Sequence, residues 1–107
     1  MPRPRRFTIT FAPETVAHLD AIERKDYRLI RQTIESQLSF SPGQATRNRK
    51  PMEQPGPFGA TWELRFGPGH RFRVFYEFES GTRVVNVLAI GIKERNRLRI
   101  AGEEFEP

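Results

Sequence analysis

Residues 61–92 read TWELRFGPGHRFRVFYEFESGTRVVNVLAIGI, and this stretch decides the fold. Apolar and polar side chains alternate over 61–66 and again over 71–79, which is typical of half-buried strands. A turn containing glycine follows each of these runs. The third run, 83–92, is almost continuously apolar, which is typical of a strand covered on both faces at the centre of a sheet. The stretch therefore predicts three consecutive antiparallel strands.

The chain before this stretch predicts one more strand and two helices. Residues 7–11 alternate with period two and predict the strand. The first helix should open over 12–15, where proline and glutamate suit a first turn, and the second should begin at Asp26. The apolar positions at helical spacing are Val16, Leu19 and Ile22 in the first helix and Tyr27, Ile30, Ile34 and Leu38 in the second. We therefore predict an α+β fold with element order β-α-α-β-β-β, in which an N-terminal helical hairpin packs on a mainly antiparallel, four-stranded sheet.

The remaining segments connect or follow these elements. Residues 41–60 contain four prolines and three glycines with little apolar periodicity, so we expect a long loop there. A short basic segment, 93–99, should follow the last strand. The 107 residues fit a single domain, with a basic arm at 1–6 and an acidic tail at 100–107.

Composition excludes several classes of function. With no cysteine, the chain has no disulfide scaffold, no thiol nucleophile and no Cys-ligated zinc. Its two histidines argue against a multi-histidine metal site, and we expect no metal and no other cofactor. The longest apolar run, 87–90, is too short for a membrane span, and the N-terminus lacks the apolar segment of a signal peptide. We expect a cytoplasmic protein with no membrane partner.

Charge is the most informative part of the composition. Eighteen Lys and Arg against thirteen Asp and Glu give a net charge of +5, and fifteen of the cations are arginine. Residues 44–99 carry eleven cations and five anions, so most of the excess lies in the half that predicts strands. Arginine binds phosphate through two parallel hydrogen bonds. The excess indicates either a plain solvated surface or a partner that is rich in phosphate or is an acidic protein.

The polar face of the first two strands in 61–92 groups such side chains. Glu63 and Arg65 share one side of the first strand, and Arg71 and Arg73 share one side of the second. Since a turn makes these strands antiparallel neighbours, the four side chains should converge on one face. Lys93 should join them from just past the last strand. A solvent-exposed face with cross-strand ion pairs would show the same pattern.

Arginines beside one carboxylate suit metal-free cleavage of a phosphodiester such as RNA. The reaction requires activation of a 2′-hydroxyl, neutralisation of the charge on the phosphate and protonation of the leaving oxygen. Glu63 could serve as the base, and Lys93, Tyr76 or His70 as the acid. Tyr76 also fits a core tyrosine, and His70 fits a surface residue. Phe75, an aromatic residue on the polar face, could stack on a base or pack under the N-terminal strand.

Five short stretches resemble, in order, the RelE/ParE superfamily of type II toxin–antitoxin toxins. They are FTITFAPE (7–14), RNRK (47–50), WELR (62–65), RVFY (73–76) and AIGIK (89–93). The resemblance implies the family's β-α-α-β-β-β fold and an antitoxin that wraps the toxin. RelE-like members cleave mRNA on the ribosome, whereas ParE-like members poison DNA gyrase. It therefore implies a toxin with ribosome, mRNA and antitoxin as partners, and the RelE-like branch is favoured.

The resemblance also implies roles for single residues. Arg73 matches the arginine that stabilises the scissile phosphate, Arg65 matches a basic position on the preceding strand, and Lys93 stands where RelE-like enzymes often have an arginine. Together with Glu63 they form the expected catalytic set. The expected RNA-binding residues are Arg49, Lys50, Arg71 and Arg95. The C-terminal tyrosine of the best-known RelE-type site is absent, with Arg99 near its place. That absence keeps two alternatives open, a gyrase poison and a degenerate toxin that only binds its antitoxin.

Overall fold

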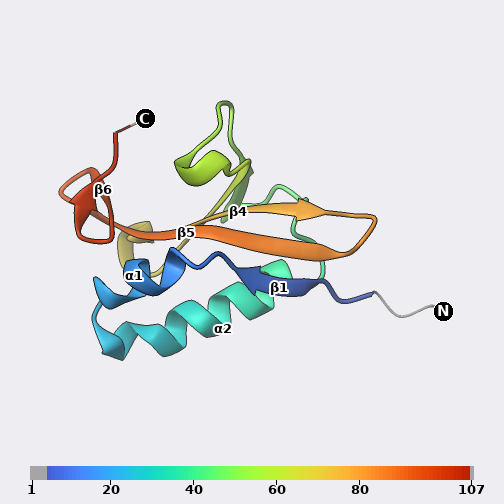
Figure 1. The fold of residues 1–107 in the computed structure, drawn as a ribbon, viewed down its shortest axis with the longest axis horizontal. Coiled ribbons are helices and arrows are strands. Elements are labelled where there is room, and N and C mark those ends of the chain that lie inside the picture. Colours follow the sequence, from blue (N-terminus) through green and yellow to red (C-terminus); the bar gives the residue numbers. More distant parts are fainter. Residues whose placement is uncertain (1–4, 107) are drawn as a thin grey trace.

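The computed structural model describes residues 5–106, which form a sheet with its helices on one face (Figure 1). Most of the basic arm at 1–6 lies outside the described residues. The helices are α1 (Thr15–Asp20) and α2 (Tyr27–Leu38), and three 3₁₀ turns are η1 (Arg24–Asp26), η2 (Pro57–Gly59) and η3 (Pro68–His70). The strands are β1 (Thr8–Phe11), β2 (Arg49–Pro51), β3 (Trp62–Phe66), β4 (Phe72–Glu79), β5 (Val84–Glu94), β6 (Arg97–Ile100) and β7 (Glu103–Glu104).

The sheet in this part of the chain has seven strands, in the order β2-β3-β4-β5-β6-β7, with β1 paired to β5 outside this path. Every pair is antiparallel except β1 with β5, which is parallel. β5 is the longest strand, and it pairs with β4 along one edge and with β1 and then β6 along the other. Its predicted central place is confirmed. The α+β class and the mainly antiparallel sheet are confirmed as well.

The prediction of four strands is wrong, because β2, β6 and β7 lie in segments expected to be loop, basic segment and tail. β2 is a three-residue edge strand within the proline-rich segment and is too short to show a periodicity. β6 follows the two-residue turn 95–96, whose φ angles are 50° and 64°. Turns of this kind usually contain Asn-Gly or another glycine pair, and neither is present here. The sequence therefore carries no clear hairpin signal at either place.

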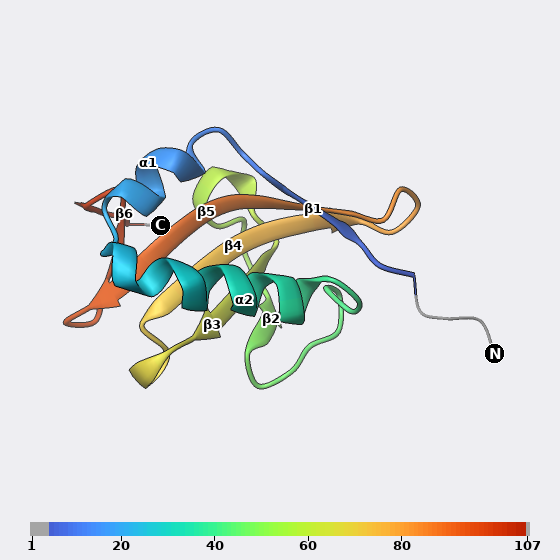
Figure 2. The ribbon, with the colours of Figure 1, turned by 90° about the horizontal axis from the view of Figure 1, so that it is seen from below.

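The predicted helical hairpin is not formed either. α1 has only six residues, less than two turns, and η1 connects it to α2. Its buried side chains are Thr15 and His18, whereas Val16 is 66% exposed. α2 alone crosses the sheet (Figure 2), and its buried residues are Ile30, Ile34 and Leu38, as expected. Neither helix of residues 5–106 is long and apolar enough to cross a membrane.

Two apolar clusters hold the layers together, one on each face of the sheet. The larger lies between α2 and the sheet and includes Ile30, Ile34, Leu38, Leu64, Phe72, Val74, Tyr76 and Ile90. The smaller, on the other face, contains Ala60, Phe75, Ala89 and Ile100, with Met52, Leu88, Leu98 and Phe105 packed against it. Phe75 is 1% exposed and belongs to this second core, so it is neither open to a base nor packed under β1. Full burial of a side chain of this size contributes about 1.5–3 kcal/mol.

Candidate functional site

Strand pairing places three of the expected catalytic residues side by side on one face. Arg65 on β3 lies directly opposite Arg73 on β4. Glu63 precedes Arg65 by two residues, so the two side chains point to the same face. Gly91 on β5 lies opposite Arg73, and Lys93 follows it by two residues with the same orientation. The structure thus brings the four side chains of the expected catalytic set to one face.

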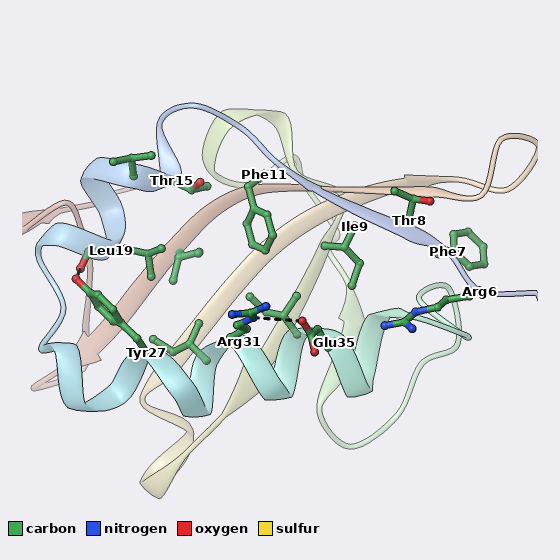
Figure 3. Close-up of a pocket in the computed structure, with 14 residues that line it drawn as sticks. Arg6, Phe7, Thr8, Ile9, Phe11, Thr15, Leu19, Tyr27, Arg31 and Glu35 are labelled. Carbon is green, nitrogen blue, oxygen red and sulfur yellow. Dashed lines mark hydrogen bonds and ion pairs between the residues drawn. The ribbon is translucent and has the colours of Figure 1, made fainter.

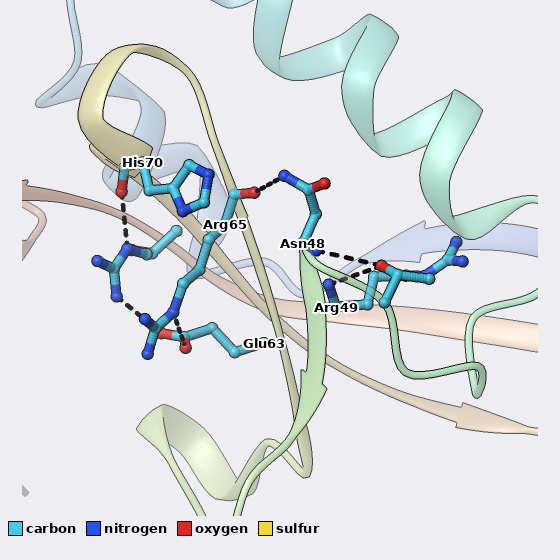
Figure 4. Close-up of polar contacts among 7 residues, drawn as sticks. Asn48, Arg49, Glu63, Arg65 and His70 are labelled. Atoms are coloured by element: carbon cyan, nitrogen blue, oxygen red, sulfur yellow. Dashed lines mark hydrogen bonds and ion pairs between the residues drawn. The ribbon is translucent and has the colours of Figure 1, made fainter.

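Glu63 bridges the two arginines (Figure 4). Its Oε1 accepts a hydrogen bond from Arg65 Nε at 2.6 Å, and its Oε2 accepts one from Arg73 Nη1 at 3.3 Å. Arg73 Nε also donates to the main-chain oxygen of His70 at 2.9 Å. The side chains of Arg73 and Glu63 are 9% and 10% exposed, and that of Arg65 is 35% exposed. The three residues form a nearly buried Arg–Glu–Arg triad whose open side is at Arg65.

The triad carries one more positive than negative charge. Burial lowers the pKa of Arg73, the neighbouring charge of Arg65 lowers it further, and Glu63 acts in the opposite direction. The ordinary pKa of a guanidinium is so high that Arg73 still remains a cation. Two guanidinium groups with one carboxylate between them leave a charge that a phosphate can neutralise with short, charge-assisted hydrogen bonds.

The triad lies in the wall of a cleft of about 590 Å³. Lys50 on β2 and Lys93 on β5 also line this cleft and bring the number of its cations to four. Lys93 does not follow the last strand, as the sequence predicts, but lies inside β5 opposite Leu98 of β6. The other lining residues come from the end of β2 and the loop after it, from β4 and from the C-terminal segment: Pro51, Met52, Glu53, Gln54, Pro55, Gly56, Pro57, Phe75, Asn96, Leu98 and Phe105.

Arg49 does not reach the cleft. It is 8% exposed, its Nε donates to the main-chain oxygen of Gln44 at 3.1 Å, and its Nη1 donates to that of Gln37. Gln37 lies in the last turn of α2, where main-chain oxygens lack partners within the helix and a cation is favourable. These contacts give Arg49 a structural role in place of the expected contact with RNA.

Three further candidates lie away from the cleft. The guanidinium of Arg71 lies 5.0 Å from the centre of the Phe72 ring. Arg95 is exposed in the turn between β5 and β6. Tyr76 is fully buried on the α2 face, where its hydroxyl donates to the main-chain oxygen of Pro42 at 2.7 Å and burial raises its pKa. Tyr76 is therefore a core residue, and it cannot supply a proton to a ligand in the cleft.

Sequence patterns did not point to Glu53, Gln54 or Asn96, although all three line the cleft. The first two lie on the loop after β2, and the third lies in the turn between β5 and β6. The one available signal was the length of the segment 41–60, because long loops in compact domains are usually functional or disordered. Among residues 5–106, no group of three or more His, Asp or Glu side chains could hold a metal ion.

A second concave surface lies on the other face of the sheet, between β1, α1 and α2 (Figure 3). This apolar groove has a volume of about 900 Å³. Phe11 and Val16 border it and are 49% and 66% exposed, and the Arg31–Glu35 ion pair of 3.4 Å lies on its α2 side. The other lining residues are Arg6, Phe7, Thr8, Ile9, Thr15, Leu19, Tyr27, Ile30, Ile34 and Ile90. The sequence did not predict the groove, since it depends on how three elements pack.

The structure is an α+β fold with an apolar groove on the helical face and a basic cleft on the other. It is similar to a chain in the crystal structure of the toxin–antitoxin complex RelBE2 from Mycobacterium tuberculosis, with a TM-score of 0.59 and 16% sequence identity. The match covers 79% of this chain and 95% of that chain. No family model and no curated protein sequence matches the chain. At this identity the likeness is one of fold, and it supports the α+β fold that the resemblance implies.

Proposed function

We propose that this chain is the toxin of a type II toxin–antitoxin pair, and that it inhibits translation by cleaving mRNA on the ribosome without a metal. The observation that carries the proposal is the Arg–Glu–Arg triad in the wall of a cleft that two lysines also line. The likeness in fold to a chain of the RelBE2 complex supports it.

The four cations of the cleft fit the charges of this reaction. Arg65, with its open side, and Arg73, held rigidly by its two partners, would bind the non-bridging oxygens of the scissile phosphate. Charge on these oxygens grows in the transition state, so fixed guanidinium groups stabilise it more than the ground state. Lys93 would give a proton to the leaving 5′-oxygen, and Lys50 would neutralise a neighbouring phosphate.

Primer extension on mRNA engaged by translating ribosomes tests the proposal. Wild-type protein should create new mRNA ends, and Arg73→Ala should slow cleavage by about 100-fold or more, the usual effect of removing one transition-state donor. Arg28→Ala, which removes an exposed arginine of α2, is the matched control and should cut at the wild-type rate. Intact mRNA with wild-type protein, or unchanged cleavage by Arg73→Ala, would refute the proposal.

We also propose an antitoxin as the partner of this chain. An amphipathic segment would fill the apolar groove, and acidic residues would dock on the basic cleft partly by charge. Val16→Arg places a charge in the groove at a position that is already exposed, so folding should be preserved. The variant should weaken antitoxin binding and leave mRNA cleavage unchanged. If the antitoxin bound the wild type and Val16→Arg equally well, the groove would not be part of the interface.

A ParE-like gyrase poison is the second candidate. The observation that favours it is the lining of the cleft, which contains no tyrosine and no histidine among the residues that the structure describes. This function predicts loss of DNA supercoiling with intact mRNA. The primer-extension experiment therefore separates the two candidates, and a growth assay on induction identifies a degenerate toxin, which would be harmless.

A further inference from the structure

Glu53 and Glu63 are the two carboxylates that line the cleft in the described part of the chain. We propose that Glu53 accepts the proton of the attacking 2′-hydroxyl, whereas Glu63 positions the two arginines. This inference rests on the proposed endonuclease function. It replaces Glu63, the base expected from the sequence, by a residue that no sequence pattern singled out.

Glu63 is already fully engaged. One of its oxygens accepts from Arg65 and the other from Arg73, and the side chain is 10% exposed. If Glu63 took up a proton, two adjacent guanidinium groups would lose their shared counter-ion in a poorly solvated place, which is costly. That loss would occur in the step in which both arginines must hold the phosphate. Glu63 is thus suited to positioning the arginines and poorly suited to proton transfer.

Glu53 differs from Glu63 in each of these respects. It is exposed, and no hydrogen bond or ion pair to another side chain of residues 5–106 occupies its carboxylate. It lines the same cleft as the triad. Neither histidine nor tyrosine lines this cleft, so Glu53 is the described lining residue with a free group of the kind that usually acts as a general base.

The loop that carries Glu53 is held at both ends. The amide of Met52 donates to the main-chain oxygen of Thr61 at 2.8 Å, and the amide of Gly56 donates to that of Ala60 at 2.9 Å. A side chain at Gly56 would come within 2.5 Å of the Met52 sulfur, so the two ends of the loop also pack closely. Prolines two residues to either side of Glu53 restrict the backbone further. This anchoring keeps a flexible side chain at the edge of the cleft, where an approaching ribose can meet it.

The step balances without an added oxidant, reductant or water. Glu53 takes the proton of the 2′-hydroxyl, and the oxygen forms a bond to phosphorus. The bond from phosphorus to the 5′-oxygen breaks, and that oxygen takes a proton from Lys93. The products are a 2′,3′-cyclic phosphate and a 5′-hydroxyl. Afterwards Glu53 releases its proton to solvent, and Lys93 takes up a proton from solvent.

Single-turnover cleavage on mRNA-programmed ribosomes tests the inference, with binding to the same complexes measured in parallel. Glu53→Gln should cleave about 100-fold more slowly or worse, the usual contribution of a general base, with binding unchanged. The rise in rate with pH on the acidic side should disappear in this variant. Glu94→Gln makes the same change at an exposed residue of β5 that does not line the cleft, and it should cleave like wild type.

Each outcome supports or overturns one statement. Inactive wild-type protein overturns the proposed endonuclease function itself. If wild-type protein cleaves and Glu53→Gln cleaves within threefold of the wild-type rate, the role of Glu53 alone is overturned. The same holds if Glu53→Gln loses binding by the same factor as it loses rate. Glu63→Gln should lose rate but keep the rise with pH, since the proton acceptor is still present. If Glu63→Gln does not fold, the rate and pH profile of Glu53→Gln alone decide whether Glu53 is the general base.

Discussion

Glu63 should be essential for stability as well as for the site, because it is the counter-ion of a buried cation. Arg73 and Glu63 are 9% and 10% exposed at their side chains, and their closest contact is 3.3 Å. Glu63→Gln keeps the shape of the side chain but removes the charge. Breaking a buried pair by removing one partner costs about 3–5 kcal/mol, and glutamine retains one acceptor, so we expect about 3 kcal/mol. Arg65 adds little, since its side chain is 35% exposed and water can solvate it.

A loss of this size is a large part of the 5–15 kcal/mol typical of a folded domain and should lower the melting temperature by about 12–20 °C. Urea unfolding followed by Trp62 fluorescence measures the loss in free energy of unfolding, because this single tryptophan packs against Tyr76 and Phe78. The double variant Glu63→Gln/Arg73→Met removes the unpaired cation and should recover about 2 kcal/mol. A double variant less stable than Glu63→Gln would refute the argument, since it would show that Arg73 stabilises the fold without its counter-ion.

Three further predictions concern the stability of the fold. His18 Nδ1 accepts from the Ile90 amide at 3.2 Å, and burial lowers the His18 pKa below its ordinary 6.5, with Glu14 opposing. The stability from His18 should therefore be full above about pH 6.5 and be lost as pH falls through the lower folded-state pKa. Urea midpoints should drop less on acidification in His18→Gln, and an equal drop would contradict this. Gly91→Ala brings a methyl group within 2.8 Å of a main-chain oxygen of β6 and should cost about 1–3 kcal/mol in the same assay. Tyr76→Phe leaves a buried carbonyl unpaired and should cost about 1–2 kcal/mol, whereas an unchanged midpoint would mean that water replaces the hydroxyl.

The faces of β3 and β4 were predictable because the period of a strand is two. Once 61–66 and 72–79 form neighbouring strands, Glu63, Arg65 and Arg73 must lie on one face. Polar and apolar side chains alternate in 61–66 and 71–79, and this alternation predicted that the face with Glu63, Arg65 and Arg73 is polar. Its burial was not predictable, because the loop after β2 and the C-terminal hairpin cover it.

The strands that border the cleft, β2 and β6, could not be predicted from the sequence either. β2 has three residues, and β6 follows a turn in which Arg95 and Asn96 adopt positive φ without glycine. Asparagine favours this conformation more than most residues but arginine does not, so the pair lacks the Asn-Gly or Asp-Gly signal of a two-residue hairpin. Arg49 shows the opposite error. The resemblance implied that it binds RNA, yet its guanidinium donates to the main-chain oxygens of Gln44 and of Gln37 at the end of α2.

The cleft and the groove open on opposite faces of one sheet. How tightly a protein partner binds in the groove is therefore separate from whether it covers the cleft. Under the proposed function, a segment that fills only the groove would bind the chain tightly and still leave the arginines of the cleft accessible to RNA. Inhibition of cleavage would then require a second segment that passes around the edge of the sheet to the cleft. A shortened partner would bind tightly without blocking cleavage, so its affinity for this chain would not measure its inhibition.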